Sequence, residues 1–204
     1  TRGRMAEVVF DMTGHAKVFS HALSLLCKQG RLGLIGDTGT PAEQHLTPES
    51  AVDIQSRLGS DIAMMFDECP PWPGDAESIR AAVDRTLRWA QRGRDRFLKV
   101  REGLVPDVER STPGQLQFGI IQGGTHLALR DYSVQGTLKV GFDAYAIGGL
   151  SVGEPVDTMY DVVAHTAAQL PEDRPRYLMG TGMPIDLVES VARGAGESEG
   201  AVKR

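Results

Sequence analysis

Short apolar runs and longer amphipathic segments alternate along the chain. Runs rich in Val, Ile, Leu and Phe predict buried strands, whereas longer stretches with apolar residues three or four positions apart predict helices. Pro184 and Gly194 mark the ends of one such helix, because proline suits the first helical turn and glycine the position after the last. The predicted strands are 7–13, 31–37, 60–66, 116–122, 142–149 and 176–180, and the predicted helices are 16–30, 76–102, 126–140, 157–170 and 184–194.

This alternation of strands and helices predicts an α/β fold with parallel strands. Two stretches carry no such pattern. Residues 38–50 predict a linker, and residues 195–204, which are small and polar, predict a loose tail.

Composition narrows the class of protein. A chain of 204 residues is typical of one domain, or of one domain and a fragment. The formal net charge of −5 leaves no overall field that would attract nucleic acid or an anionic membrane. Cys27 and Cys69 form neither a disulfide framework nor a zinc site by their spacing. With no signal peptide and no membrane-spanning apolar run, we expect a soluble cytoplasmic protein without a membrane partner.

The strand 60–66 ends in an unusual way, with Asp67, Glu68 and Cys69 followed by three prolines within four residues. Proline lacks the backbone donor of a sheet ladder, so the chain must leave the sheet there on a stiffened loop. An aspartate at a strand end is also a common turn or cap residue, and this simpler interpretation remains open.

Three later strands end in a similar way, in Gln122–Gly124, Gly148–Leu150 and Met179–Gly182. In a β/α barrel such ends share the face that carries the chemistry, and glycine lets backbone N–H groups approach a ligand closely. A carboxylate, a carboxamide and backbone amides around one pocket suit a planar ring such as guanine. Its N1–H and 2-amino group are donors and its O6 is an acceptor. Glycines that merely terminate strands are the alternative, which explains each site alone better than all of them together.

Four strings carry a family resemblance: LTPESAVDIQSRLGSDIAMMFDECPPWP, FGIIQGG, GFDAYAIGGLSVGEP and RYLMGTGMPIDLVESVARG. Over about residues 46–194 the chain resembles the tRNA-guanine transglycosylase family. The resemblance implies a pentosyltransferase with a TIM-type barrel that exchanges guanine at the wobble position of tRNA for a 7-deazaguanine in queuosine biosynthesis. A full barrel takes about 250 residues or slightly fewer, so we expect a partial (β/α) barrel of about four units.

The resemblance also implies roles for individual residues. Asp67 would bind the N1 and 2-amino edge of guanine, and Gln122 and the backbone amide of Gly149 would contact O6. The target nucleotide must leave its stack to reach such a pocket.

Three further residues of the implied site are Cys69, Met179 and Leu150. Cys69 and Met179 would line the pocket, and the carbonyl of Leu150 would face the substituent of the incoming base.

Base exchange with retained configuration requires a nucleophilic carboxylate and a second group for proton transfer. In the family the nucleophilic aspartate lies in a D-x-F-D-C strand after the VARG helix, and the acid/base aspartate lies in a D-S-G-G turn. The family's zinc is bound by a Cys-x-Cys-x-x-Cys motif and a His. None of these strings occurs here, so the sequence identifies no catalytic residue and no metal ligand. We therefore expect a truncated enzyme, with a protein partner that completes the barrel.

Residues 6–47 resemble instead the later βαβ part of the coenzyme domain in zinc-dependent medium-chain alcohol dehydrogenases. The predicted organisation is thus a dehydrogenase-like βαβ segment at 1–47, a transglycosylase-like barrel portion at 48–194 and the tail at 195–204. Two alternatives to a transglycosylase remain: a non-catalytic subunit that binds tRNA or the base, and a fragment of a nicotinamide-dependent oxidoreductase.

Overall fold

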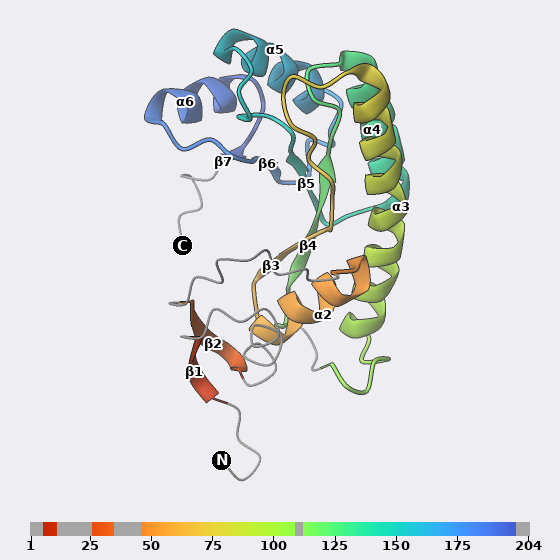
Figure 1. Cartoon of the computed structure of the whole chain (residues 1–204), viewed down its shortest axis with the longest axis vertical. Helices are drawn as coiled ribbons and strands as arrows, with labels where there is room; N and C mark the ends of the chain where they lie inside the picture. Colours follow the sequence, from red (N-terminus) through yellow and green to blue (C-terminus); the bar gives the residue numbers. More distant parts are fainter. Residues whose placement is uncertain (1–5, 12–25, 35–45, 109–111, 199–204) are drawn as a thin grey trace. The chain divides into compact units, whose positions relative to one another are not determined.

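A computed structural model describes residues 6–11, 26–34, 46–108 and 112–198 (Figure 1). The strands are β1 (Ala6–Asp11), β2 (Leu26–Leu34), β3 (Ile62–Met64), β4 (Leu116–Ile121), β5 (Ala144–Ile147), β6 (Arg176–Leu178) and β7 (Glu197–Ser198). The helices are α2 (Pro48–Leu58), α3 (Ala76–Arg101), α4 (Leu127–Val140), α5 (Val156–Ala167) and α6 (Pro184–Ala192). The chain divides into two compact units, one of residues 1–63 with 95–115 and the other of residues 64–94 with 116–204.

The second unit contains most of a sheet whose strands lie in the order β3-β4-β5-β6-β7, which is also their order along the chain. The pairs β4–β5, β5–β6 and β6–β7 are parallel. Helices α4, α5 and α6 each connect one of these strands to the next, as Figure 1 shows. This arrangement confirms the predicted α/β fold and is that of a partial TIM-type β/α barrel.

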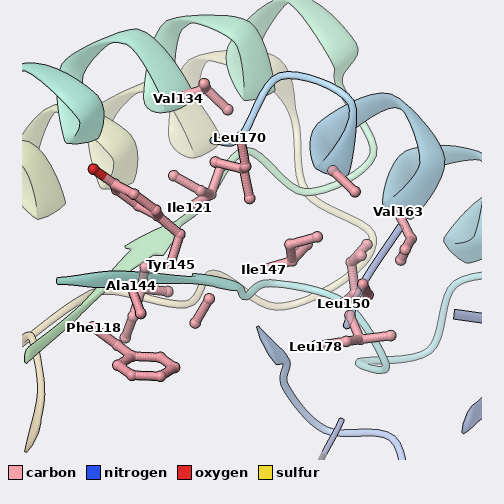
Figure 2. Close-up of a cluster of buried hydrophobic side chains, with 14 of the residues drawn as sticks. Phe118, Ile121, Val134, Ala144, Tyr145, Ile147, Leu150, Val163, Leu170 and Leu178 are labelled. Atoms are coloured by element: carbon pink, nitrogen blue, oxygen red, sulfur yellow. The ribbon is translucent and has the colours of Figure 1, made fainter. Parts of the chain in front are cut away.

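The core of this unit lies on both faces of the sheet: Figure 2 shows Ile121 and Tyr145 on the side of the helices and Phe118 on the opposite side. All four residues of β5 are buried, which is typical of a central parallel strand. Side chains from β4, β5 and β6 meet those of α4 and α5 in one cluster that includes Phe118, Ile121, Val134, Ala144, Tyr145, Ile147, Leu150, Val163, Leu170 and Leu178. Burying each large apolar side chain contributes about 1.5–3 kcal/mol, so this cluster keeps the strand ends in place.

In the first unit, β1 pairs with β2 in parallel. A smaller core contains Val52, Ala63, Phe97, Val100 and Val108.

Among the described residues of the whole chain, no helix combines the length and apolar character needed to cross a membrane.

The predicted elements from residue 60 to residue 194 are all present, and their ends agree within three residues. Helix α2 was not predicted, and its first residues fall in the predicted linker 38–50. The Thr47 side chain accepts from the Ser50 N–H and the Ser50 side chain accepts from the Thr47 N–H, while Gly59 ends the helix at φ 68°. This reciprocal cap uses serine in place of the usual Glu or Gln, so the sequence signal was weak.

The predicted helix 16–30 is wrong over residues 26–30, which belong to strand β2. Parallel pairing with β1 in this region, with Ala6 opposite Leu26, overrides the helical spacing of the apolar residues. Residues 16–25 of that predicted helix lie outside the described residues, as do 12–13 and 35–37 of the two predicted strands.

The segment predicted as a tail begins in the sheet. Ala195 is fully buried and its N–H donates to the Ser190 carbonyl at 2.9 Å. Residues Glu197 and Ser198 then pair with Tyr177 and Leu178 of β6. A small residue fits the buried turn after α6, and the free edge of β6 supplies the backbone partners for β7. Residues 199–204 lie outside the described residues.

Candidate functional site

The polar and glycine-rich residues at the ends of four strands come together in the second unit. The Gly148 N–H donates to the Ile121 carbonyl at 2.9 Å, and the Met179 N–H donates to the Ile147 carbonyl at 3.1 Å. These bonds extend the ladders beyond β4, β5 and β6, so the segments that follow these strands start at one edge of the sheet. The structure thus brings together residues that the sequence analysis grouped only by analogy with a barrel.

Asp67, after β3, and Gln122, after β4, are in direct contact. Gln122 Nε2 donates to Asp67 Oδ2 at 2.6 Å. Desolvation raises the pKa of the half-buried Asp67 carboxyl, and the bond from Gln122 opposes part of this rise. The Gln122 backbone N–H donates to Ser133 Oγ at 3.0 Å, which holds the residue against α4.

The second amide atom of Gln122 is unpaired. Gln122 is 1% exposed, and its Oε1 has no hydrogen-bond partner among the described residues. Buried polar atoms in proteins nearly always have a partner, so an orphan acceptor beside a carboxylate marks a place where a ligand or a side-chain rearrangement could supply one.

Gly148 and Gly149, after β5, pack directly against this carboxamide. A Cβ atom at Gly149 would lie 2.2 Å from Gln122 Oε1, and one at Gly148 would lie 2.9 Å from Gln122 Nε2. Gly149 also has φ 66°, a left-handed conformation that favours glycine. These glycines therefore do more than terminate a strand, because any side chain there would displace Gln122.

Leu150 lies in the core at 4% exposure, while its carbonyl oxygen lies 3.5 Å from where a Cβ of Gly180 would stand. The loop that follows is held by Glu154, whose carboxylate accepts from the N–H groups of Ser151 and Val152. Sequence reasoning missed Glu154, because nothing in its local pattern distinguishes it from a surface glutamate.

Met179, after β6, is partly buried and packs against the core cluster. Its sulfur lies 3.5 Å from the place of a Cβ at Gly148, so the thioether borders the same glycine pair.

Cys69 is exposed, yet the pKa of its thiol is raised, first by partial desolvation and then by the charge of Asp67. The positive charge of Arg130 and the backbone of Gly149 act in the opposite direction. The thiol is therefore neutral at neutral pH and close enough to Asp67 to feel its charge.

Glu68, the neighbour of Asp67, faces elsewhere. Its N–H donates to Thr86 Oγ1 at 3.0 Å, and its carboxylate forms an ion pair with Arg85 on α3. Of the two adjacent carboxylates, only that of Asp67 contacts Gln122.

Arg130 on α4 is a second residue that sequence reasoning missed. It is fully buried, and burial lowers the pKa of its guanidinium to about 9, which still leaves it charged at neutral pH. Among the described residues, its side-chain hydrogen bonds all go to backbone carbonyls, at the end of β4 and in the segments after β4 and β5. In the sequence it lies between Leu129 and Asp131 on a helix, a setting that is also typical of a surface position.

The described residues contain no group of three or more His, Cys, Asp or Glu side chains that could hold a metal ion. The donor set of the described residues therefore does not fit the zinc that the family resemblance implies.

Comparison with known proteins gives the family. A family model described as "Queuine tRNA-ribosyltransferase" matches residues 13–196. The protein of the same name from Psychromonas ingrahamii is 51% identical over 153 residues, which cover 75% of this chain and 38% of that protein. Its namesake from Shewanella piezotolerans is 49% identical over 149 residues, which cover 73% and 37%. That from Vibrio cholerae is 51% identical over 146 residues, which cover 72% and 36%.

The chain thus spans little more than a third of the length of the curated relatives it matches. The resemblance of residues 6–47 to alcohol dehydrogenases finds no support in these comparisons, and the family match already begins at residue 13. The family match extends over the strand ends that form the site. The chain belongs to the queuine tRNA-ribosyltransferase family.

Proposed function

We propose that this chain recognises guanine, or the 7-deazaguanine that replaces it, in the exchange of the wobble base of tRNA. The observation that carries the proposal is the contact between Gln122 Nε2 and Asp67 Oδ2 at 2.6 Å, with Gln122 Oε1 left unpaired. Without a base, the Gln122 amide donates to the Asp67 carboxylate that a base would use. The hydrogen-bond donor and acceptor needed for a base are therefore already side by side and paired with each other.

Guanine would open this pair by taking over both partners. Its N1–H and 2-amino group would donate to Asp67, which releases the Gln122 amide to donate to O6. The Gly149 N–H would donate to O6 as well. A hydrogen bond to a charged group contributes about 1.5–3 kcal/mol, so Asp67 would supply most of the discrimination.

The remaining site residues would border the base. Cys69 and Met179 would line the pocket, and the Leu150 carbonyl, held beside Gly180 by the loop that Glu154 fixes, would face the substituent of an incoming 7-deazaguanine. The base would have to be extruded from the anticodon loop to enter, which makes tRNA the proposed macromolecular partner.

Within the proposed exchange, no described residue is assigned as the nucleophile. Asp67 would be engaged with the base edge, and Glu68 is paired with Arg85. The same recognition contacts would also serve a non-catalytic base-binding subunit. Exchange of labelled guanine into tRNA distinguishes the enzyme from the binding subunit. A protein partner and a cytoplasmic location are likewise part of the proposal.

Calorimetry with three purines tests the base-recognition role. Guanine offers N1–H, the 2-amino group and O6, hypoxanthine lacks the 2-amino group, and adenine offers neither N1–H nor O6. We expect guanine to bind about tenfold or more tightly than hypoxanthine, because one donor to Asp67 is lost, and adenine not to bind measurably. Equal binding of the three purines, or no saturable binding of guanine, would overturn the proposal.

A further inference from the structure

Arg130 joins both segments that carry the Gln122 and Gly149 contacts. Its Nε donates to the Gly124 carbonyl at 2.8 Å, and its Nη1 donates to the Ile121 carbonyl at 3.0 Å. On the other segment, Nη1 donates to the Gly148 carbonyl at 2.7 Å and Nη2 donates to the Gly149 carbonyl at 3.2 Å. One rigid guanidinium therefore fixes the distance between the end of β4 and the segment after β5.

A buried arginine that donates to backbone carbonyls is not explained by the need to fill space, since an apolar side chain would fill the same volume at a lower free-energy cost. Desolvating a cation costs far more than packing an apolar side chain of the same volume, unless its hydrogen bonds hold something in place. The planar guanidinium presents its donors in a fixed fork, which the flexible ammonium of lysine cannot imitate. The chemistry of the side chain thus points to a geometric task.

That task follows from peptide geometry. The Gly148 carbonyl and the Gly149 N–H belong to one planar trans peptide, so they point in opposite directions. Because the carbonyl is held toward Arg130, the N–H must point away from it. The left-handed φ of 66° at Gly149 lets the next carbonyl turn toward the guanidinium as well.

From these contacts we infer that Arg130 is a positioning residue, which aims the Gly149 N–H at O6 of the bound base. The inference rests on the proposed function, since O6 is the atom that this N–H would meet. Arg130 does not touch the base. It acts through the Gly148–Gly149 peptide, and its charge polarises that peptide so that the N–H is a stronger donor.

The test compares guanine with 6-thioguanine, which keeps N1–H and the 2-amino group but replaces O6 by a weaker acceptor. The wild-type chain should prefer guanine, because a directed N–H discriminates between oxygen and sulfur. In Arg130→Met we expect guanine affinity to fall about tenfold and the preference over 6-thioguanine to disappear, which corresponds to the loss of one directed hydrogen bond. Arg130→Lys should retain the charge but recover only part of the preference.

Arg94→Met is the matched control. Arg94 is also a nearly buried arginine of the same unit, but it pairs with Asp143. Its loss should lower stability without changing the ratio of guanine to 6-thioguanine affinities. An Arg130 variant that folds and keeps the wild-type ratio would overturn the inference.

A wild-type measurement covers the case in which the Arg130 variants do not fold. The Gly149 amide proton should move downfield in NMR spectra when guanine is added, and less so with 6-thioguanine. A Gly149 amide that does not respond to guanine would overturn the inference. If the wild-type chain binds no guanine at all, the proposed function itself fails, so the two failures are distinguishable.

Discussion

The Gln122 carboxamide donates from Nε2 to Asp67 Oδ2 at 2.6 Å, across 55 positions of sequence. This contact joins the ends of two neighbouring strands and occupies the groups that the proposed base would use. A ligand that binds here must replace the contact with at least as many hydrogen bonds. A base with two donors and one acceptor on adjacent positions meets that requirement.

Asp67→Asn should abolish the preference for guanine and leave the fold intact. An amide placed against N1–H and the 2-amino group offers a donor where an acceptor is needed, which leaves buried groups unpaired at a cost of about 1–3 kcal/mol. Calorimetry of both proteins with guanine measures the effect. Glu68→Gln is the control, since Glu68 is adjacent but pairs with Arg85, and unchanged guanine affinity in Asp67→Asn would contradict the assignment.

Guanine binding should weaken as pH falls, and it should do so above the ordinary carboxyl range. Desolvation raises the pKa of Asp67 from 3.8, so its carboxyl takes up a proton at a higher pH than a free one. The protonated form accepts less well from N1–H. Affinity should therefore be full above the raised pKa and decline as pH passes down through it, whereas Asp67→Asn should show no such step. A wild-type affinity that stays constant down to pH 3.8 would contradict this linkage.

The same shift makes a prediction for stability. Because the folded state binds the Asp67 proton more tightly than the unfolded state, its contribution to stability is present below 3.8 and is lost as pH rises through the raised pKa. At neutral pH, Asp67→Asn should therefore unfold at an equal or slightly higher urea concentration than the wild type. A clear loss of stability would show that the ionised carboxylate supports the fold.

Gly149→Ala should eliminate guanine binding and destabilise the protein. Its Cβ would lie 2.2 Å from Gln122 Oε1 and would occupy a left-handed conformation, which alone costs about 1–2 kcal/mol. Gly141→Ala is the matched control, because Gly141 has φ 81° and nothing within 4 Å of its Cβ position. Urea unfolding should show a larger loss of stability for Gly149→Ala than for Gly141→Ala. Equal losses would mean that Gln122 moves aside at no cost in free energy.

Asp143→Ala should destabilise the unit strongly. The Asp143 carboxylate accepts from Arg94 Nη1 at 3.0 Å and from the Gln117 N–H at 3.0 Å, and the two ionic side chains are only 10% and 18% exposed. Removing one partner of a buried pair costs about 3–5 kcal/mol. Asp84→Ala removes an exposed ion pair with Arg80 and should change stability little, because solvent screens exposed pairs. Similar urea midpoints for the two variants would contradict the difference in burial.

Purified chain should hold no stoichiometric zinc. Its two cysteines lie 42 positions apart, 69 minus 27, and the described residues offer no cluster of three or more metal-binding side chains. A tetrahedral zinc site takes four such ligands in structural centres. Elemental analysis after dialysis decides the matter, and one zinc per chain would show that ligands exist beyond the described residues.

By itself, the sequence determined the alternation of strands and helices from residue 60 onward and the unusual ends of the strands. Hydrophobic periodicity reports which face of an element is buried, so elements with one clear apolar face could be predicted within a few residues. It failed at α2, whose cap uses an atypical residue at Ser50, and at β2, where pairing with β1 outweighed helical spacing. The sequence also placed Asp67, Gln122 and Gly149 after the ends of strands, because the end of a strand is a local property of the sequence.

Only the tertiary structure decided which of these groups touch. The bond from Gln122 to Asp67, the packing of Gln122 on Gly149 and the four carbonyls around Arg130 each depend on how neighbouring strands are aligned. A helical arginine such as Arg130 looks like a solvated residue in sequence, because its burial depends on carbonyls supplied by two other segments. Hydrogen-bond partners far apart in the chain are set by strand alignment and helix packing, which no local pattern of residues encodes.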